Sequence, residues 1–308
     1  MKYIIIEMPE VMEIRKYADF INLLLKNHKL NDIKITGGRY KKHKAFEKYD
    51  LLKNNLPLKL ISVKTKGKFI YMEFEKNLYI LNTLGLSGGW AFQKNNAKQF
   101  QMPQLLEYID ETKVEVYLLR SMEHINVEFT FDTGKLVFFD MLSFGTLKVI
   151  NDTKTLEKKL NTLGPDIMDE NTTLDIFESR IKTNSNIDKQ IGVVITNQKL
   201  ISGIGNYIRA DALWLAKINP FRKVKDLNKN EIKKLFHSLK VITWGNYNRK
   251  YAVTYKIINK KDKIPYDYNR DFYVYREEKD IYNNPIVKEE LYEGSQKRFI
   301  YWVKGYQN

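Results

Sequence analysis

The sequence predicts an α+β protein with two folded parts. Residues up to about 150 contain short runs rich in β-branched and aromatic side chains, which are typical of antiparallel strands. Beyond Pro165 the apolar residues recur at three- and four-residue steps, which indicates helices. The length of 308 residues fits two domains, since one domain usually takes about 100 to 200 residues. We therefore expect a β-sandwich with one packed helix, followed by a helical domain and a C-terminal β-hairpin.

The first part begins with a helix and continues with strands. From Pro9 to Leu25 the apolar residues follow helical spacing and predict an amphipathic helix. Residues 58–85 predict three strands, the first two joined by a turn at Gly67. Residues 125–141 predict a further β-hairpin. These elements together predict the β-sandwich.

The second part is helical and ends in strand-like sequence. Residues 151–165 combine a short helix with a Gly-Pro stop and predict an interdomain linker. Helical periodicity returns between residues 172 and 247, and the last forty residues alternate like strands. The expected organisation is a leader at 1–8, a β-sandwich domain at 9–150, a linker at 151–165, a helical domain at 166–265 and a hairpin at 266–308.

The composition favours a polyanionic partner. Lysine and arginine number 52 against 37 acidic residues, which gives a net charge of +15. Such cations release condensed counterions when they neutralise phosphates. A lysine-rich solvated surface would give the same balance, so motifs must decide between the two interpretations.

The composition also excludes several kinds of site. The absence of cysteine excludes disulfides and every cysteine-containing metal site. The four histidines lack ligand spacing, so we expect no metal and no cofactor: His28, His43, His124 and His237. No apolar run is long enough for a signal peptide or a membrane span, so we expect an intracellular, non-secreted protein without membrane contact. We expect it to be a monomer.

The most informative stretch is TNQKLISGIGNYIRADALWLAKINPFR, from Thr196 to Arg222. It predicts a helix, a turn at Gly203 and Gly205, and a second helix that Pro220 closes. Two glycines let the backbone approach a phosphate closely, and the N-terminus of the next helix offers N–H groups and the positive end of its dipole. A tight turn between two helices would use the same residues, so the turn alone does not define a function.

The whole string resembles the helix-two-turn-helix motif of the formamidopyrimidine-DNA glycosylase / endonuclease VIII (Fpg/Nei) family. The matching residues are Asn197-Gln198, Gly203 to Tyr207, Arg209 to Leu213 and Pro220. The resemblance implies a DNA glycosylase of base excision repair that acts on damaged DNA. It also implies that Asn206 bonds the phosphates flanking the lesion, helped by the backbone amides of the glycine turn.

The resemblance extends over most of the chain and makes residues 9–150 the catalytic domain. Residues 64–90 resemble the family's hairpin and intercalation loop, and LGPDIM resembles its interdomain joint. Many members end in a four-cysteine zinc finger. The cysteine-free C-terminus here resembles the zincless-finger members, in which packing holds a similar hairpin without metal. Arg298 would then be the arginine near the lesion, the alternative being an exposed arginine on a hairpin.

The resemblance also implies three residues that fill the gap in the DNA. Flipping a nucleotide out of the stack costs a few kcal/mol, and an inserted side chain occupies the space left behind. The matching positions are Leu86, Leu142 and Phe144. The family often has an arginine at the position of Leu142, where it pairs with the orphaned base, so the opposite-base preference stays open. Each of the three could instead be a core residue.

The chemical step needs an amine that attacks the sugar C1′ and forms an iminium, so that the phosphate can leave by β-elimination. A terminal α-amino group has a pKa of about 7.7 to 8.0 and is neutral far more often than a lysine at about 10.4. The resemblance implies Pro9 as nucleophile, Glu10 as general acid/base and Glu13 as a second, structural carboxylate. Lys68 matches the lysine that contacts the phosphate and assists the leaving group.

The start of the chain departs from the family pattern. Met12 replaces a second proline, and residues 1–8 precede Pro9, whose nitrogen has no basic lone pair while it is part of a peptide bond. A second alignment would match Pro9 to that second proline and place Ile6 at the nucleophile position, which would leave the chain inactive. We favour the first alignment because it carries both carboxylates and the following helix without a gap. We expect a start at Met8, or processing, to expose Pro9.

The expected activity is that of a bifunctional DNA glycosylase and abasic-site lyase, acting by β- or β,δ-elimination. The string GIGNYIRADAL favours oxidised pyrimidines as substrates. A non-enzymatic DNA-binding paralogue with a blocked or missing nucleophile is the main alternative, and an RNA-binding module is a third.

Overall fold

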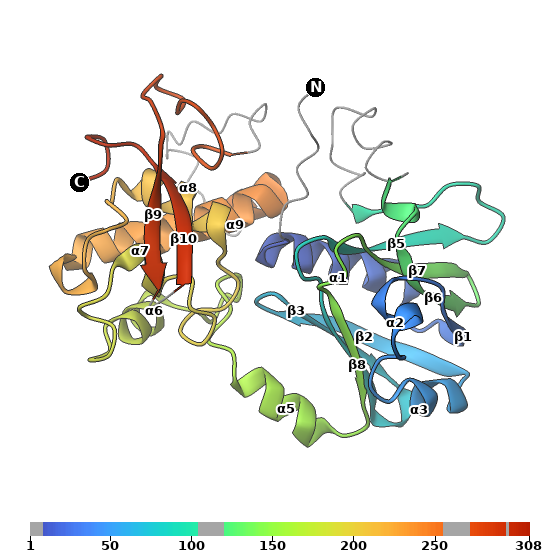
Figure 1. The fold of residues 1–308 in the computed structure, drawn as a ribbon. Helices are drawn as coiled ribbons and strands as arrows, with labels where there is room; N and C mark the ends of the chain where they lie inside the picture. Colours follow the sequence, from blue (N-terminus) through green and yellow to red (C-terminus); the bar gives the residue numbers. More distant parts are fainter. Residues whose placement is uncertain (1–8, 104–119, 255–271, 294–295) are drawn as a thin grey trace. The chain divides into compact units, whose positions relative to one another are not determined.

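The computed structural model describes residues 9–103, 120–254, 272–293 and 296–308. The chain divides into two compact units (Figure 1). The first contains Pro9 and residues 13–161, and the second contains residues 10–12 and 162–308. The leader expected at 1–8 lies outside the described residues. The α+β class is confirmed, with a β-sheet domain first and a helical domain after it.

The first unit is an antiparallel sheet with a helix packed on it. Its strands lie in the order β5-β7-β6-β1-β2-β3-β4-β8. Their bounds are β1 (Lys29–Ile35), β2 (Leu58–Lys66), β3 (Phe69–Phe74), β4 (Leu78–Thr83), β5 (Gly88–Lys94), β6 (Ile125–Phe131), β7 (Gly134–Asp140) and β8 (Thr146–Ile150). The helices are α1 (Val11–Leu25), α2 (Gly38–Lys42), α3 (Tyr49–Asn54), the 3-10 turn η1 (Glu75–Asn77) and α5 (Thr153–Asn161). The three strands expected in 58–85 and the hairpin in 125–141 are confirmed.

One hydrophobic core holds both halves of this sheet together. The halves are joined by only two residue pairs between β1 and β2, Lys29 with Lys59 and Leu30 with Leu58. Helix α1 contributes Ile14, Ala18, Ile21 and Leu25 to the core, the apolar face expected from its spacing. Trp90 lies fully buried at the centre against Phe129 and Phe138, and its Nε1 donates to Asn82 Oδ1 at 3.0 Å. Burying each large apolar side chain stabilises the fold by about 1.5 to 3 kcal/mol.

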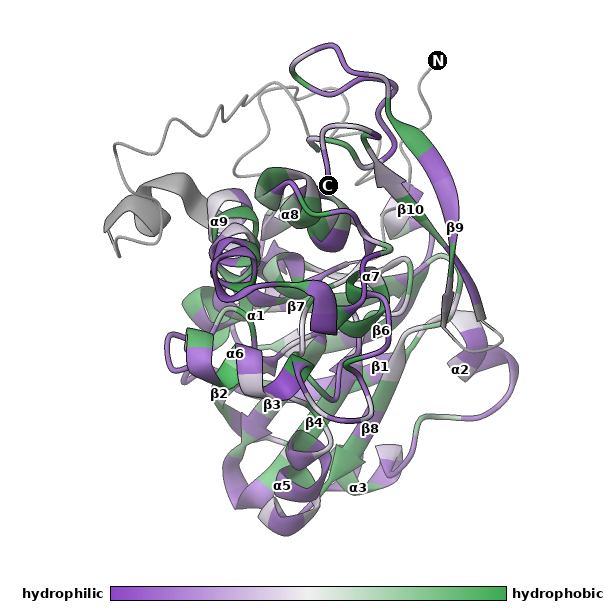
Figure 2. Ribbon diagram, turned by 90° about the vertical axis from the view of Figure 1, so that its left-hand side faces the viewer, coloured by the Kyte–Doolittle hydropathy of each residue, from purple (hydrophilic) through white to green (hydrophobic). Residues whose placement is uncertain are grey.

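The second unit is helical and ends in a two-stranded hairpin. Its helices are α6 (Leu174–Ile181), α7 (Ile191–Val194), α8 (Asn206–Ala216), the 3-10 turn η3 (Val224–Asp226) and α9 (Lys229–Thr254). The hairpin consists of β9 (Val287–Glu293) and β10 (Gln296–Trp302), which pair in register from Gln296 opposite Glu293 to Trp302 opposite Val287. Figure 2 shows α8 as a largely apolar helix, in contrast to the mostly polar α5. This colouring agrees with the almost complete burial of α8.

Helix α8 holds the C-terminal segment through aromatic and polar contacts. The indole of Trp214 stacks with Tyr273, Tyr282 and Tyr306 at centroid distances of 5.0, 6.0 and 5.6 Å. Its Nε1 donates to Asp280 Oδ2 at 3.1 Å, and the other Asp280 oxygen accepts from the N–H groups of Tyr282 and Asn284. These contacts pack the segment before β9 against α8 through both side chains and backbone N–H groups.

Two negative findings apply to the described residues alone. Over these residues, no helix is long and apolar enough to cross a membrane. Within the same part of the chain, no group of three or more histidine, aspartate or glutamate side chains is arranged to hold a metal ion.

Candidate active site and nucleic-acid interface

The glycine turn before α8 is closed by Gln198 and requires glycine at one position. Gln198 accepts a hydrogen bond from Gly203 N at 2.9 Å and donates to Ile204 O at 2.8 Å. Gly203 adopts φ +107°, and a Cβ there would come within 2.8 Å of the Val11 side chain. Both the left-handed backbone and the close approach of Val11 exclude other residues at this position.

Glu10 binds the N-terminus of α8. Its carboxylate is 1% exposed and accepts from Gly205 N at 2.8 Å, Tyr207 N at 3.1 Å and Ile208 N at 3.3 Å. The first N–H groups of a helix lack helical partners, and the helix dipole favours a negative charge there. The carboxylate therefore serves as the anion at this helix end. Pro9, the candidate nucleophile, directly precedes it in the chain.

The hydrogen bonds of Glu10 and Gln198 change how the turn can meet a phosphate. The N–H groups of Gly203 and Gly205, which the sequence suggested as phosphate donors, are used within the protein. Asn206 at the first position of α8 is half-buried, and its Oδ1 accepts from Arg209 at 3.4 Å. An amide whose oxygen is engaged in this way presents its NH₂ group as the donor. The NH₂ group of Asn206 is therefore a side-chain donor at this turn.

Two buried charges of α8 connect the turn to the C-terminal hairpin. Arg209 is fully buried and donates to Gly192 O at 3.2 Å and Phe299 O at 2.7 Å, in addition to Asn206. Asp211 is also fully buried and accepts from the N–H groups of Tyr273, Val274 and Tyr275. Burial raises the pKa of Asp211 to about 7, although the three N–H donors act in the opposite direction.

Arg298, the candidate lesion contact on the hairpin, lies in β10 opposite Leu291. Side chains alternate between the faces of a strand, so Arg298 shares a face with Ile300, which is buried. The opposite face carries the exposed Phe299, with Lys288 and Lys297 near its ring at 4.3 and 5.3 Å. The arginine is half-buried in this position.

The three candidate void-filling residues lie on two neighbouring loops of the first unit. Leu86 follows β4, and Leu142 and Phe144 lie between β7 and β8. They are 40%, 49% and 59% exposed, so none of them is a core residue. A Cβ at Gly85, which has φ +65°, would approach Gly145 N to 2.6 Å, so the two loops are in contact.

Ser87 and Asp140 connect these two loops by hydrogen bonds. Ser87 Oγ donates to Asp140 Oδ1 at 2.5 Å and accepts from Leu142 N at 2.8 Å. The second Asp140 oxygen accepts from Gly145 N at 2.6 Å. Both side chains are buried. Three exposed apolar side chains thus lie on one platform of two hydrogen-bonded loops.

The remaining candidates also lie at defined places. Lys68 is half-buried in the turn between β2 and β3, next to Gly67 at φ +55°. Glu13 lies in the first turn of α1, where the positive end of the helix dipole stabilises a negative charge. Pro9 directly precedes Glu10, so the chain itself keeps these two together. Lys68 belongs to the first unit, as does Glu13, whereas Glu10 and Asn206 belong to the second.

Sequence reasoning missed the residues that support the site. Ser87 and Asp140 were not singled out, and Arg209 and Asp211 were noted only as part of a motif. The available signal was the presence of charged and polar residues within otherwise apolar stretches, since a buried charge needs partners. Their partners are mostly backbone groups, which no side-chain pattern reveals.

Models of two protein domains match this chain. The formamidopyrimidine-DNA glycosylase N-terminal domain matches residues 8–147, and the formamidopyrimidine-DNA glycosylase H2TH domain matches residues 163–245. The two matches cover more than half of the sequence and include the loop platform, Glu10 and the glycine turn. The chain therefore belongs to the Fpg/Nei family of DNA glycosylases.

Individual relatives agree with this assignment. Endonuclease 8 of Escherichia coli K12 / DH10B is 25% identical over 240 residues, which are 78% of this chain and 80% of that protein. Endonuclease 8 of Shigella dysenteriae serotype 1 is 25% identical over 232 residues, 75% of this chain and 77% of that protein. The crystal structure of Lactococcus lactis Fpg with abasic-site DNA has a TM-score of 0.72 at 19% identity, covering 97% of this chain and 100% of that one. MutM with DNA containing carbocyclic 8-oxo-G gives 0.71 at 20% identity, with coverages of 97% and 99%.

Proposed function

We propose that this protein is a bifunctional DNA glycosylase and abasic-site lyase that excises oxidised bases, with Pro9 as its nucleophile once that residue is N-terminal. The observation that carries the proposal is the buried Glu10 carboxylate bound to the N-terminus of α8. It brings the residue after the nucleophile to the helix that begins with Asn206. The match to the family's N-terminal domain begins at Met8, directly before Pro9, and supports the alignment in which Pro9 is the nucleophile.

The chemistry follows from a free secondary amine at this position. Its lone pair attacks C1′, and the bond from C1′ to the base breaks as the base leaves with a proton. The amine then loses its proton, the C1′–O4′ bond breaks and O4′ takes up a proton, which leaves the opened sugar as an iminium. Loss of a proton from C2′ then expels the 3′ phosphate. Glu10 is the carboxyl group adjacent to the amine and would transfer protons, and Lys68 would contact the phosphate. Asn206 would hold the phosphates that flank the flipped nucleotide.

Oxidised pyrimidines are the proposed substrate class. The string GIGNYIRADAL is most similar to the Nei-like version of the motif, and the curated relatives of 25% identity are named Endonuclease 8. One related complex of Lactococcus lactis Fpg holds DNA with an oxidised pyrimidine, so the fold accommodates such a lesion. Leu86, Leu142 and Phe144 would fill the space that the extruded base leaves.

Borohydride trapping on abasic-site DNA tests the proposal. Chains starting at Met1 and at Met8 would be compared, the second with its methionine removed, and the crosslinked residue would be mapped by mass spectrometry. We expect the second chain to crosslink through Pro9 and the first to give no adduct, because a peptide-bonded proline cannot form an iminium. A crosslink through a lysine would refute Pro9 as nucleophile. If neither chain traps but both bind lesion DNA, the protein is a non-enzymatic DNA-binding paralogue.

A further inference from the structure

A cationic segment, Arg39–Lys44, comprises the last four residues of α2 and the turn that follows, and it lies apart in the sequence from Glu10, Asn206 and the two loops. We call these six residues, RYKKHK, the basic turn. No acidic residue occurs between Asp32 and Glu47. The side chains of residues 41–45 are exposed. Within the described part of the chain, ion pairs join Lys53 to Asp32 and Lys148 to Glu47, whereas Lys41, Lys42 and Lys44 form none.

The basic turn is anchored at both of its ends. The Tyr40 ring is buried, its hydroxyl accepts from Leu147 N at 2.6 Å, and its edge contacts Phe46 at a centroid distance of 5.4 Å. Glu47 O accepts from Val149 N at 3.0 Å. Gly38 before the turn has φ +60°, and a Cβ there would overlap the Asn126 side chain. The cations are therefore presented from a fixed backbone that is hydrogen-bonded to β8.

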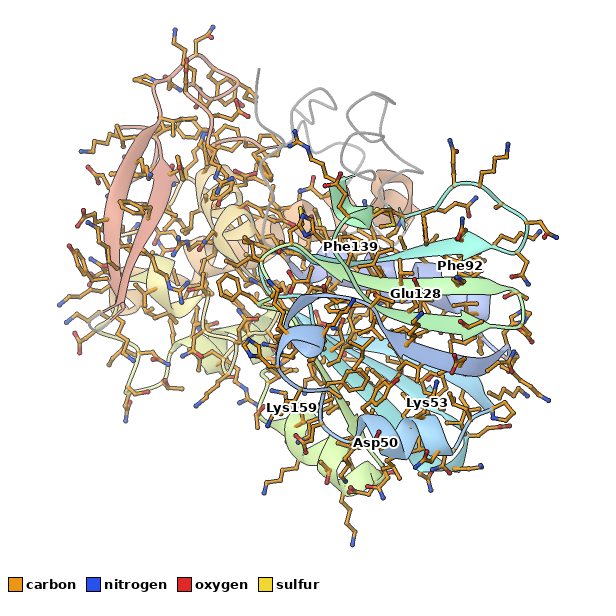
Figure 3. The ribbon with its side chains drawn as sticks, turned by 45° about the vertical axis from the view of Figure 1, so that its right-hand side comes forward. Asp50, Lys53, Phe92, Glu128, Phe139 and Lys159 are labelled. Carbon is orange, nitrogen blue, oxygen red and sulfur yellow. The ribbon has the colours of Figure 1, made fainter. Side chains whose placement is uncertain are left out.

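The anchoring places the basic turn at the same end of the sheet as the void-filling loops. Strand β8 begins at Thr146, directly after the loop with Leu142 and Phe144. The β5–β7 ladder runs from Gly88 opposite Asp140, beside both loops, to Lys94 opposite Gly134. In Figure 3, Phe139 marks the loop end of this ladder and Phe92 lies toward the other end. Thr36 and Gly37 hydrogen-bond to Asn126 O, one residue from Ile125, which pairs with Phe139 at the loop end.

We propose that the basic turn binds the phosphate backbone of duplex DNA beside the nucleotide that the two loops contact. This inference rests on the proposed function only in taking DNA as the partner. Three exposed lysines, beside the half-buried Arg39 and with no acidic residue nearby in the sequence, complement a row of phosphates. Each phosphate that is neutralised releases condensed counterions. Lysines contact phosphates without reading bases, so the turn would add affinity equally on every sequence. Its phosphate contacts would hold the DNA next to the two loops.

The test measures binding of a duplex with a tetrahydrofuran abasic analogue over a range of salt concentrations. The variant is Lys41→Gln, Lys42→Gln, Lys44→Gln. The control removes the same charge from the far end of the sheet: Lys29→Gln, Lys94→Gln, Lys98→Gln. Each lysine is exposed, so neither substitution removes a core contact.

The basic-turn variant should lose affinity and salt dependence together. We expect the slope of log K against log salt to become shallower by up to about 2.7, since each phosphate contact contributes about 0.9. Affinity should fall at least tenfold at low salt for lesion and undamaged duplex alike, and the control should stay within twofold of the wild type. Equal slopes for the variant and the control would overturn the inference.

Trapping separates this inference from the proposed function. With enzyme and DNA at saturating concentrations, the variant of the Met8 chain should still crosslink through Pro9, because the basic turn contributes only to binding. If no chain traps but the salt slopes differ as expected, the basic turn binds DNA and the lyase proposal fails. If trapping proceeds and the slopes are equal, the lyase proposal stands and the basic turn has no role in binding.

Discussion

Asn206 shows how one side chain can be oriented by its neighbour. Its oxygen accepts from Arg209, which is fully buried and also donates to the backbone of β10 at Phe299. Because the oxygen is engaged, the NH₂ group is left as the donor for a phosphate. An asparagine at this position therefore supplies both an acceptor for Arg209 and a donor, which a side chain that can only accept would not.

Substitution of Asn206 should separate binding from folding. A hydrogen bond to a charged group contributes about 1.5 to 3 kcal/mol, so Asn206→Ala should weaken lesion-DNA binding and excision together by about 10- to 100-fold. Asn206→Asp is the matched control, since it keeps the acceptor for Arg209 and replaces the donor by a negative charge. It should bind DNA more weakly than the alanine variant. Unchanged binding in Asn206→Ala would rule out its contact with a phosphate.

Asp211 makes the stability of the second unit depend on pH. Desolvation raises the pKa of Asp211 from 3.8 to about 7 in the folded protein. The native state therefore binds the proton more tightly than the unfolded chain, and the unfolding free energy falls as pH rises from about 4 to about 7. Between pH 5 and pH 8 this single group lowers the unfolding free energy by about 2 to 3 kcal/mol.

Denaturant unfolding of Asp211→Asn tests whether the unfolding free energy falls as pH rises. The stability advantage of the wild type over the variant should shrink by about 2 to 3 kcal/mol between pH 5 and pH 8, since asparagine does not titrate. Asp175→Asn, at an exposed position of α6, should show no comparable change. A constant difference at both pH values would mean that the three N–H donors keep Asp211 ionised throughout.

At the scale of elements, the two loops are connected by residues other than their exposed apolar tips. Ser87 and Asp140 hold the loops by buried hydrogen bonds, whereas Leu86 and Phe144 project outward. The buried polar residues support the loops, and the exposed apolar residues do not take part in these hydrogen bonds. The tips are therefore open to substitution without loss of the fold.

Truncation of the tips should impair function and spare stability. Leu86→Ala and Phe144→Ala should each change the unfolding free energy by at most about 0.5 kcal/mol, as expected for exposed positions. Single-turnover excision should fall at least about tenfold, because an unfilled gap leaves a few kcal/mol of unstacking uncompensated. Leu23→Ala, at an 80% exposed leucine on α1, should change neither quantity. Full excision activity in both loop variants would show that these side chains do not enter the DNA.

At the scale of the whole molecule, the net charge of +15 predicts strong and salt-sensitive binding to any duplex. The affinity for undamaged DNA should fall with a slope of at least about 3.6 in log K against log salt, as for four or more phosphate contacts. Fluorescence anisotropy between 50 and 200 mM salt measures this slope. A slope below one would mean that the excess lysines serve solvation rather than binding.

The sequence by itself determined the local elements and the family. The spacing of Ile14, Ala18 and Ile21 marks α1, and turn residues between alternating runs mark the three strands in 58–85, because both signals arise between near neighbours in the chain. The string around Gly203 carried the family assignment, which the domain matches confirm. The roles of Pro9, Glu10 and Lys68 remain predictions.

Only the tertiary structure decided how the site is supported. Glu10 meets Gly205 across 195 positions, Ser87 meets Asp140 across 53, and Tyr40 meets Leu147 across 107. Two of these three bonds have a backbone N–H as donor, and every residue except proline carries that group, so no residue type announces them. The N–H groups of the glycine turn were expected to face a phosphate, but they donate to Gln198 and to Glu10 of the same chain. Folding brings the Glu10 carboxylate to the turn from 195 positions away, and no local sequence pattern indicates such a contact.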